Sequence, residues 1–163
     1  MTEVRVGIGY DSHRFAGART LVLGGIEFPG VPGLEGHSDA DVLTHAVIDA
    51  VLGAAGLGDI GRHFPDDDPR YSGADSVGLL SEAASMARGA GWRAVNVDAT
   101  VICEQPRLAP AVAEMSERLG QALGVDAERV NVKATTNEGM GFIGRGEGIA
   151  AIAVALIERE SAS

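Results

Sequence analysis

The sequence predicts an α+β protein with a mixed four- to five-stranded sheet and helices packed on one face. Segments with alternating or continuous apolar residues are interspersed with segments whose apolar residues recur every three or four positions. Their order along the chain is β, β, α, α, β, α, β, β. A length of 163 residues is typical of one domain around a single core, so we expect residues 1–163 to form one domain.

The first half of the chain is expected to hold two strands and one long helix. The strands are "VRVGIGYDSHRF" and the β-like segment "TLVLGGIEFPG", which Pro29 is expected to end. In "SDADVLTHAVIDAVLGAAG" the apolar residues have helical spacing, with Ser38 as the expected N-cap and Asp41 three residues later. Residues 59–75 are rich in aspartate, glycine and proline and show neither period, which predicts a surface loop.

The second half continues with a helix from about Asp75 to Arg88 and the alternating strand "RAVNVDATVI". A further helix is expected in "APAVAEMSERLGQAL" and a further strand in "RVNVKAT". The last segment, "GIAAIAVALIERE", is apolar on both faces, which predicts a central strand.

Composition excludes some classes of protein. The formal net charge of -10 argues against a nucleic-acid binder that works by broad electrostatic attraction. The lone Cys103 has no partner for an internal disulfide, so a buried thiol is expected. Because there is no signal-like N-terminal segment and no apolar run long enough to cross a bilayer, we expect a cytoplasmic protein.

Asp11 and His13 are two residues apart in an expected strand, so their side chains share a face and could begin a metal site. The same pair is also compatible with an ordinary polar strand end. His45 is a candidate third ligand, although it could equally be a histidine that merely borders the core. Three protein ligands would leave the fourth zinc position open, as in catalytic zinc sites. Asp49, one turn after His45, is either a partner that fixes the His45 tautomer or a solvated carboxylate.

Two further segments are candidate ligand sites. In "GHSDAD", His37 and Ser38 precede the first helix, where unpaired backbone N–H groups could bind an anion, although Ser38 could simply cap. In "VKATTNEGMGFIGRGEG", hydroxyls of Thr135 and Thr136, the Glu138 carboxylate and a guanidinium surround five glycines. A plain glycine-rich hairpin is the alternative for this second segment.

The blocks "DSH", "HSDADVLTH", "DIGRHFPD", "KATTNE" and "GFIGRGEGIA" together resemble the 2-C-methyl-D-erythritol 2,4-cyclodiphosphate synthases of the non-mevalonate isoprenoid pathway. The resemblance extends from Val6 to about Leu156. It implies a single catalytic domain and a homotrimer with active sites at subunit interfaces. It also implies zinc, or another divalent transition metal, at Asp11, His13 and His45, and magnesium or manganese near Glu138.

The family's substrate is a cytidine diphosphate ester of methylerythritol 2-phosphate, and its products are the cyclic diphosphate and CMP. Because a phosphate of the substrate is the nucleophile, the protein need only position groups and neutralise charge. By resemblance, His37 and Thr136 donate hydrogen bonds to the moving phosphate. The other implied contacts are Ser38, Asp59, Gly61 and Asp66 for methylerythritol, then Cys103, Pro106, Arg107, Leu108, Ala109 and Thr135 for cytidine, and Phe142 and Arg145 for an isoprenoid diphosphate at the trimer axis.

Glu104 departs from the family's usual residues, and an acidic side chain near a diphosphate is unfavourable for cytidine binding. Two other functions remain compatible with the residues: a regulatory trimer that binds metal and nucleotide without turnover, and a metal-dependent phosphodiesterase. Thr136 and Glu138 favour the cyclising enzyme over the regulatory trimer. No additional base for an activated water is recognisable, which disfavours the phosphodiesterase.

Overall fold

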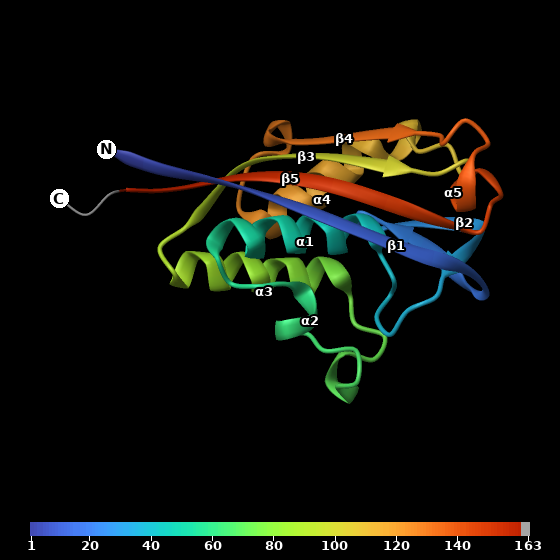
Figure 1. Cartoon of the computed structure of the whole chain (residues 1–163), viewed down its shortest axis with the longest axis horizontal. Coiled ribbons are helices and arrows are strands. Elements are labelled where there is room, and N and C mark those ends of the chain that lie inside the picture. Colours follow the sequence, from blue (N-terminus) through green and yellow to red (C-terminus); the bar gives the residue numbers. More distant parts are fainter. Residues whose placement is uncertain (161–163) are drawn as a thin grey trace.

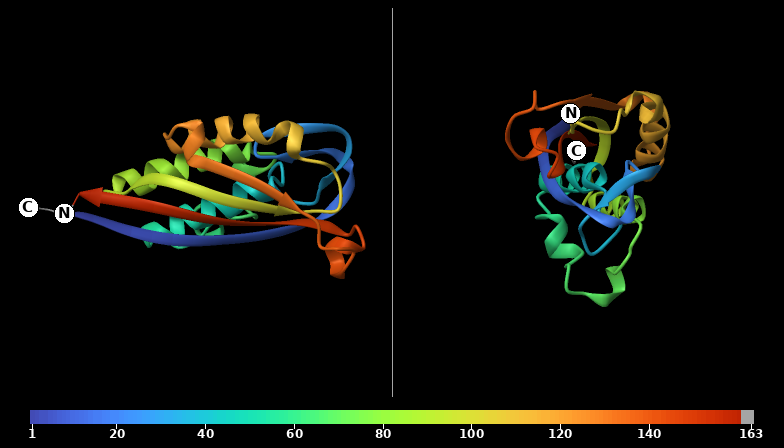
Figure 2. Two further views of the ribbon diagram at one scale, coloured as in Figure 1. Left: turned by 90° about the horizontal axis from the view of Figure 1, so that it is seen from above. Right: turned by 90° about the vertical axis from the view of Figure 1, so that its right-hand side faces the viewer.

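The computed structural model describes residues 1–160 as one curved sheet with helices on one side (Figures 1 and 2). The sheet has five strands in the order β2-β1-β5-β3-β4. β1 (Thr2–Leu23) pairs antiparallel with both β2 (Ile26–Leu34) and β5 (Gly148–Glu160). β5 also pairs antiparallel with β3 (Arg93–Ile102). β3 and β4 (Val130–Thr135) are parallel. The predicted mixed sheet is confirmed, with β5 at its centre as expected.

The helices that cover the sheet are α1 (Val42–Ala55), α3 (Ser76–Gly89) and α4 (Val112–Leu123). α1 packs on β1 and β5, α4 packs on β4, and α3 packs on both of these helices. The helices predicted for 75–88 and 109–123 are therefore confirmed to within a few residues. Their apolar faces and the inner face of the sheet form one hydrophobic core.

β1 lies unusually close to α1 because glycines face the helix. A Cβ atom built on Gly9 would lie 1.8 Å from the carbonyl oxygen of Ala46, and one on Gly7 would lie 2.0 Å from that of Ala50. No side chain fits there without moving the helix. Since Asp11 follows Gly9 on the same face, this close approach brings its carboxylate to the N-terminal half of α1.

The predicted second strand was wrong at both ends. Residues 20–23 belong to β1, and the chain reverses at Gly24 and Gly25, whose φ angles of 59° and 75° suit a tight hairpin turn. β2 then continues through Pro29 to Leu34, because β2 is an edge strand and a missing N–H is tolerated there.

The first helix begins later than predicted, and Ser38 is not its N-cap. Asp41 is the N-cap, and its fully buried carboxylate accepts hydrogen bonds from Thr44 N (3.0 Å), Thr44 Oγ1 (2.7 Å), Gly24 N (2.9 Å) and Gly25 N (2.8 Å). The expected anion site at this helix end is therefore not supported, because a carboxylate of the protein already lies there.

Residues 59–75 project beyond the helix layer (Figure 1) and are more regular than the predicted loop. They contain α2 (Ile60–His63), capped by Asp59, and a 3₁₀ turn at Pro69–Tyr71, capped by Asp68. Aspartate side chains that accept backbone N–H bonds explain this order without any hydrophobic period. A second short helix, α5 (Gly141–Gly144), lies in the turn between β4 and β5.

The outer face of the sheet is divided into an apolar and a polar half. Side chains of Val4, Val6, Ile8 and Tyr10 in β1 and of Ile152 and Val154 in β5 are all at least 39% exposed. On β3 and β4 the same face is polar, with Lys133 Nζ 2.7 Å from Asp98 Oδ2. A contiguous exposed apolar strip of this kind is typical of an interaction surface.

Candidate active site

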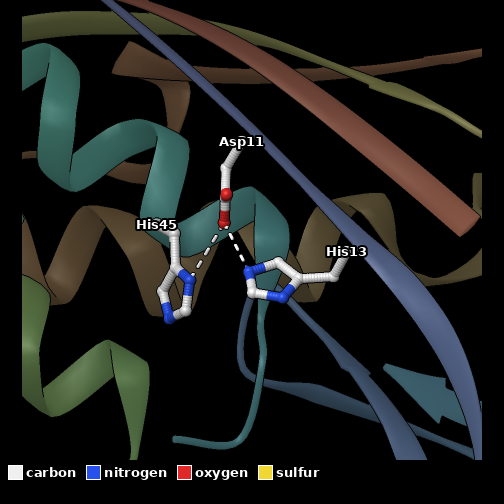
Figure 3. A group of neighbouring side chains, drawn as sticks. All are labelled: Asp11, His13 and His45. Carbon is white, nitrogen blue, oxygen red and sulfur yellow. Dashed lines mark hydrogen bonds and ion pairs between the residues drawn. The ribbon is translucent and has the colours of Figure 1, made fainter. Parts of the chain in front are cut away.

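Asp11, His13 and His45 converge on one point between β1 and α1, as the sequence predicted (Figure 3). One ligand atom from each residue lies within 4.8 Å of the other two. The Asp11 Oδ2 atom is 2.8 Å from His13 Nε2 and 3.0 Å from His45 Nδ1. One carboxylate and two imidazoles around a common point form a ligand set that suits a divalent transition metal.

The far nitrogens of both rings have partners that set their tautomers. His13 donates Nδ1–H to the carbonyl oxygen of Glu35 at 2.6 Å, which leaves the lone pair of its Nε2 pointing at Asp11. Two lone pairs that face a carboxylate repel it unless a cation lies between them. That cation is either a proton on a ring or a metal ion, so the donor set fits a metal.

His45 is oriented by Ser76 and Asp39. The Ser76 hydroxyl donates to the Asp39 carboxylate, so its oxygen accepts Nε2–H of His45 at 2.8 Å. Nδ1 of His45 is thereby left with its lone pair toward Asp11. Asp49 does not fix this tautomer, because its Oδ1 accepts the backbone N–H of Ile60 at 2.7 Å.

The pKa values of Asp11 and His13 reflect the same contacts. Burial opposes ionisation of Asp11, but its contacts with His13 and His45 in their protonated forms outweigh burial and lower the pKa of Asp11 to about 2. Burial lowers the pKa of His13, but the Asp11 carboxylate more than compensates and raises it above its ordinary value. A proton on His13 therefore competes with a metal ion for the same position.

A cavity of about 160 Å³ opens beside these ligands. Of the residues predicted to contact the substrate, His37, Ser38, Gly61 and Asp66 line it. The fifth predicted residue of this group, Asp59, is not among the lining residues, because its carboxylate caps α2 by accepting Arg62 N at 3.0 Å.

His37 and Ser38 both have partners within the chain. The Nε2–H of His37 donates to the carbonyl oxygen of Asp68 at 2.9 Å, so its Nδ1 faces away from that bond. The buried Ser38 hydroxyl accepts Ala40 N at 3.2 Å and lies 3.1 Å from His45 Nε2. Ser38 therefore helps to hold the metal-site histidine as well as lining the cavity.

A second pocket gathers the residues predicted to bind cytidine. It is lined by residues 103–109, from the segment after β3, and by residues 134–136 at the end of β4, so Thr135 and Thr136 both belong to it. Cys103 is 4% exposed, as expected for a structural thiol, and burial raises its pKa to about 11.

The two pockets share no residue, and the order of the strands explains why. The row of paired residues that starts at Asp11 in β1 passes through β5 and β3 before it reaches Ala134 in β4. Three strand spacings correspond to about 14 Å. Thr136 and Glu138 are thus not brought into the metal-ligand cluster within one chain, and both are exposed.

The residues predicted to lie at a trimer axis flank another hollow. Phe142 lines it together with Ser12, Arg14 and Glu147, next to the outer face of β1. Arg145 is not part of its lining, because its guanidinium pairs with Glu147 at 2.8 Å.

Sequence reasoning missed Ser76, Asp39 and Glu35. The sequence predicts a helix that includes Ser76, and Asp39 is part of the "GHSDAD" segment, but neither side chain is predicted to contact the site. The serine is buried next to a helix N-cap and contacts a histidine 31 residues away. Such a contact leaves no periodic pattern in the sequence. The carbonyl of Glu35 acts through the backbone and cannot be recognised from residue type.

Comparison with known proteins decides the family. A model of the YgbB family matches residues 4–158. The chain belongs to the YgbB family. A relative from Syntrophomonas wolfei, named 2-C-methyl-D-erythritol 2,4-cyclodiphosphate synthase, is 56% identical over 156 residues, which are 96% of this chain and 99% of that protein. The resemblance inferred from the motifs is confirmed.

Members of the family also occur within longer proteins. The chain is 61% identical over 156 residues to the "Bifunctional enzyme IspD/IspF" of Anaeromyxobacter sp. (strain Fw109-5), but it spans only 40% of that protein's length while 96% of the chain is matched. A solved structure, "IspF (Plasmodium falciparum) CDP complex", has a TM-score of 0.84 at 29% identity and covers 97% of each chain. These names favour an enzyme over a non-catalytic binding protein.

Within residues 1–160, no helix combines the length and apolar character needed to span a membrane. The cytoplasmic location stays a prediction.

Proposed function

We propose that this chain cyclises 4-diphosphocytidyl-2-C-methyl-D-erythritol 2-phosphate to 2-C-methyl-D-erythritol 2,4-cyclodiphosphate and releases CMP, as a phosphorus-oxygen lyase of the non-mevalonate isoprenoid pathway. The observation that carries the proposal is the convergence of Asp11, His13 and His45 beside a cavity, in a chain of the YgbB family. Residues 1–163 would act as a single catalytic domain.

In the proposed reaction an oxygen of the 2-phosphate attacks the β-phosphorus, and the bond from that phosphorus to the oxygen of the leaving CMP breaks. The attacking group belongs to the substrate, so the protein needs no nucleophilic side chain. Its contribution is to hold the chain of phosphates in line and to offset their negative charge.

Zinc is the ion that we propose for Asp11, His13 and His45, with magnesium or manganese at Glu138. Such ions, when bound, supply positive charge beside the phosphate oxygens. Other residues of the chain orient the two histidines: Glu35 holds His13, and Ser76 holds His45, each in the tautomer that leaves a lone pair for the ion.

The cavity beside the ligands would hold the methylerythritol phosphate, with Gly61 and Asp66 at its wall. His37 can donate to a phosphate only through Nδ1–H or after its bond to Asp68 is released, because Nε2–H is already engaged. The pocket at residues 103–109 would bind cytidine largely through backbone groups, and Thr136 at its edge would donate to the moving phosphate.

We propose a homotrimer in which the cavity of one subunit meets the cytidine pocket of the next. Two features support it. The pockets share no residue and lie on strands three spacings apart, about 14 Å at the backbone, so the two pockets of one chain do not adjoin each other. The exposed apolar strip on β1 and β5 offers the surface through which copies would associate.

The test is phosphorus NMR of the purified protein with the cytidylyl methylerythritol phosphate substrate, with and without magnesium. We expect signals of the cyclic diphosphate and of CMP in equal amounts. Metal and nucleotide binding without any product would support the regulatory trimer instead. A linear phosphate product beside CMP or a nucleoside diphosphate would support the phosphodiesterase.

A further inference from the structure

The side chain of Glu104 is given no role in the reaction proposed above, although the residue lines the second pocket. It is half-buried and lies two residues after the end of β3, next to Cys103, whose N–H donates to Thr135 O at 3.0 Å and holds the two segments together. Its Oε1 atom accepts the backbone N–H of Asn137 at 3.0 Å and that of Gly139 at 3.3 Å. The charge is thus directed at backbone amides and not into free solvent.

These two amides flank Glu138, which has a φ angle of 54°. A residue with a Cβ atom is strained in this left-handed region, and such strain persists only where the surroundings enforce it. Thr136 Oγ1 accepts Glu138 N at 3.2 Å, so donors on three consecutive residues are held by side-chain oxygens. Glu104 supplies two of the three bonds.

The carboxylate of Glu138 itself is exposed and makes no hydrogen bond or ion pair with any described residue. The backbone therefore fixes where this side chain leaves the turn, and no described residue holds its torsions. If the turn relaxed, a divalent ion bound there would lose a ligand whose starting point on the backbone is fixed.

Glu104 also lines the pocket proposed for cytidine. One residue thus contributes to the wall of the nucleotide pocket and, through its side chain, holds the turn that carries Glu138. A shift of the 103–109 segment on nucleotide binding would be transmitted directly to the turn.

We propose that Glu104 is a positioning residue: it holds the 136–139 turn so that Glu138 faces a divalent ion, and it couples that ion to nucleotide binding in the adjacent pocket. The proposal rests on the proposed function, because it concerns the ion and nucleotide of that reaction. It also gives the departure from the family's usual residue a structural role.

The experiment compares Glu104→Ala and Glu104→Gln with a matched control, Glu114→Ala. Glu104→Gln keeps an oxygen that accepts both amides but loses the charge. Glu114 is an exposed glutamate on α4 whose partner is Arg118 at 3.2 Å, and it lines neither pocket. All three proteins are first compared with the wild type by circular dichroism and zinc content, which should not change.

Two measurements do not depend on turnover. Hydrogen–deuterium exchange of peptides covering residues 135–140 should become faster in Glu104→Ala, by roughly tenfold, and much less in Glu104→Gln. Titration with Mn²⁺ in the presence of CDP, followed by electron paramagnetic resonance, should show affinity weakened about tenfold in Glu104→Ala and by a smaller factor in Glu104→Gln. Without CDP the difference between variants should shrink.

Exchange rates and Mn²⁺ affinity in Glu104→Ala that match Glu114→Ala would overturn the proposal, and so would a loss of fold or of zinc in both Glu104 variants. An Mn²⁺ effect of equal size with and without CDP would overturn the coupling. If the wild type releases no CMP from the substrate, the proposed function fails, while the exchange and Mn²⁺ results still decide the role of Glu104.

Discussion

The hydroxyl oxygen of Ser76 lies 2.8 Å from Nε2 of His45, and the hydroxyl proton is directed to Asp39. The imidazole therefore has one orientation and one tautomer, with its Nδ1 lone pair toward Asp11. A helix that begins at residue 76 thus controls a ligand on a helix that begins at residue 42. The contact between α1 and α3 is part of the proposed metal site and not only of the core.

Ser76→Ala should weaken zinc binding about 10- to 100-fold, because His45 Nε2 loses the nearer of its two hydroxyl partners, Ser76 at 2.8 Å and Ser38 at 3.1 Å. The measurement is competition with a chromophoric chelator. Ser72→Ala, at an exposed serine in the neighbouring turn, is the control and should bind zinc like the wild type. Unchanged zinc affinity in Ser76→Ala would show that the hydroxyl does not orient the ring.

His45→Ala should lose zinc and keep its fold. The side chain is 8% exposed and borders the cavity, so truncation enlarges a cavity that is already open to polar groups. Metal analysis beside circular dichroism tests this. A full complement of zinc in the variant would mean that Asp11 and His13 are not completed by α1.

Glu138→Gln should lower the rate of CMP release by roughly two orders of magnitude, since a lost electrostatic contact to the transition state costs on the order of 3 kcal/mol. The side chain is exposed and unpaired among the described residues, so folding and zinc content should not change. The assay is run at saturating magnesium with zinc measured in both samples. Equal rates would argue against a second metal at this position.

Ile8→Asp should convert the proposed trimer to monomer and abolish activity, while metal analysis still finds zinc. Ile8 is 70% exposed at the centre of the apolar strip, and a carboxylate there is desolvated if copies associate. Light scattering measures the mass. Ala113→Asp, exposed in the first turn of α4, is the control and should remain a trimer. A stable, active monomer would contradict the shared-site arrangement.

The zinc-free protein should depend on pH through His13. The folded-state pKa of His13 is raised by Asp11, so its contribution to stability is fully present below the unfolded value of about 6.5 and is lost as the pH rises through the raised value. The melting temperature of chelator-treated wild type should therefore exceed that of His13→Asn below pH 6.5, and the difference should shrink above it. A constant difference would show that the His13–Asp11 contact does not depend on the proton.

Much of the fold and the cluster of Asp11, His13 and His45 could be predicted because their signals are local. Helical spacing located α3 and α4, alternation located β3, and a segment apolar on both faces identified β5 as central. Asp11 and His13 share a face for the same reason, since side chains alternate along a strand. The boundaries near Gly24 and Asp41 were wrong because a hairpin turn and a buried N-cap depend on partners distant in the sequence.

By itself, the sequence determined the order of strands and helices, the residues that carry metal-binding chemistry and the family. Only the tertiary structure decided how those residues are held. Ser76 reaches His45 because α3 packs on α1, Glu104 reaches the backbone beside Glu138 because β3 and β4 are neighbours, and the two pockets stay apart because β5 and β3 separate β1 from β4. Hydrogen bonds between distant segments leave no periodic pattern in the sequence, so they can be recognised only in the folded structure.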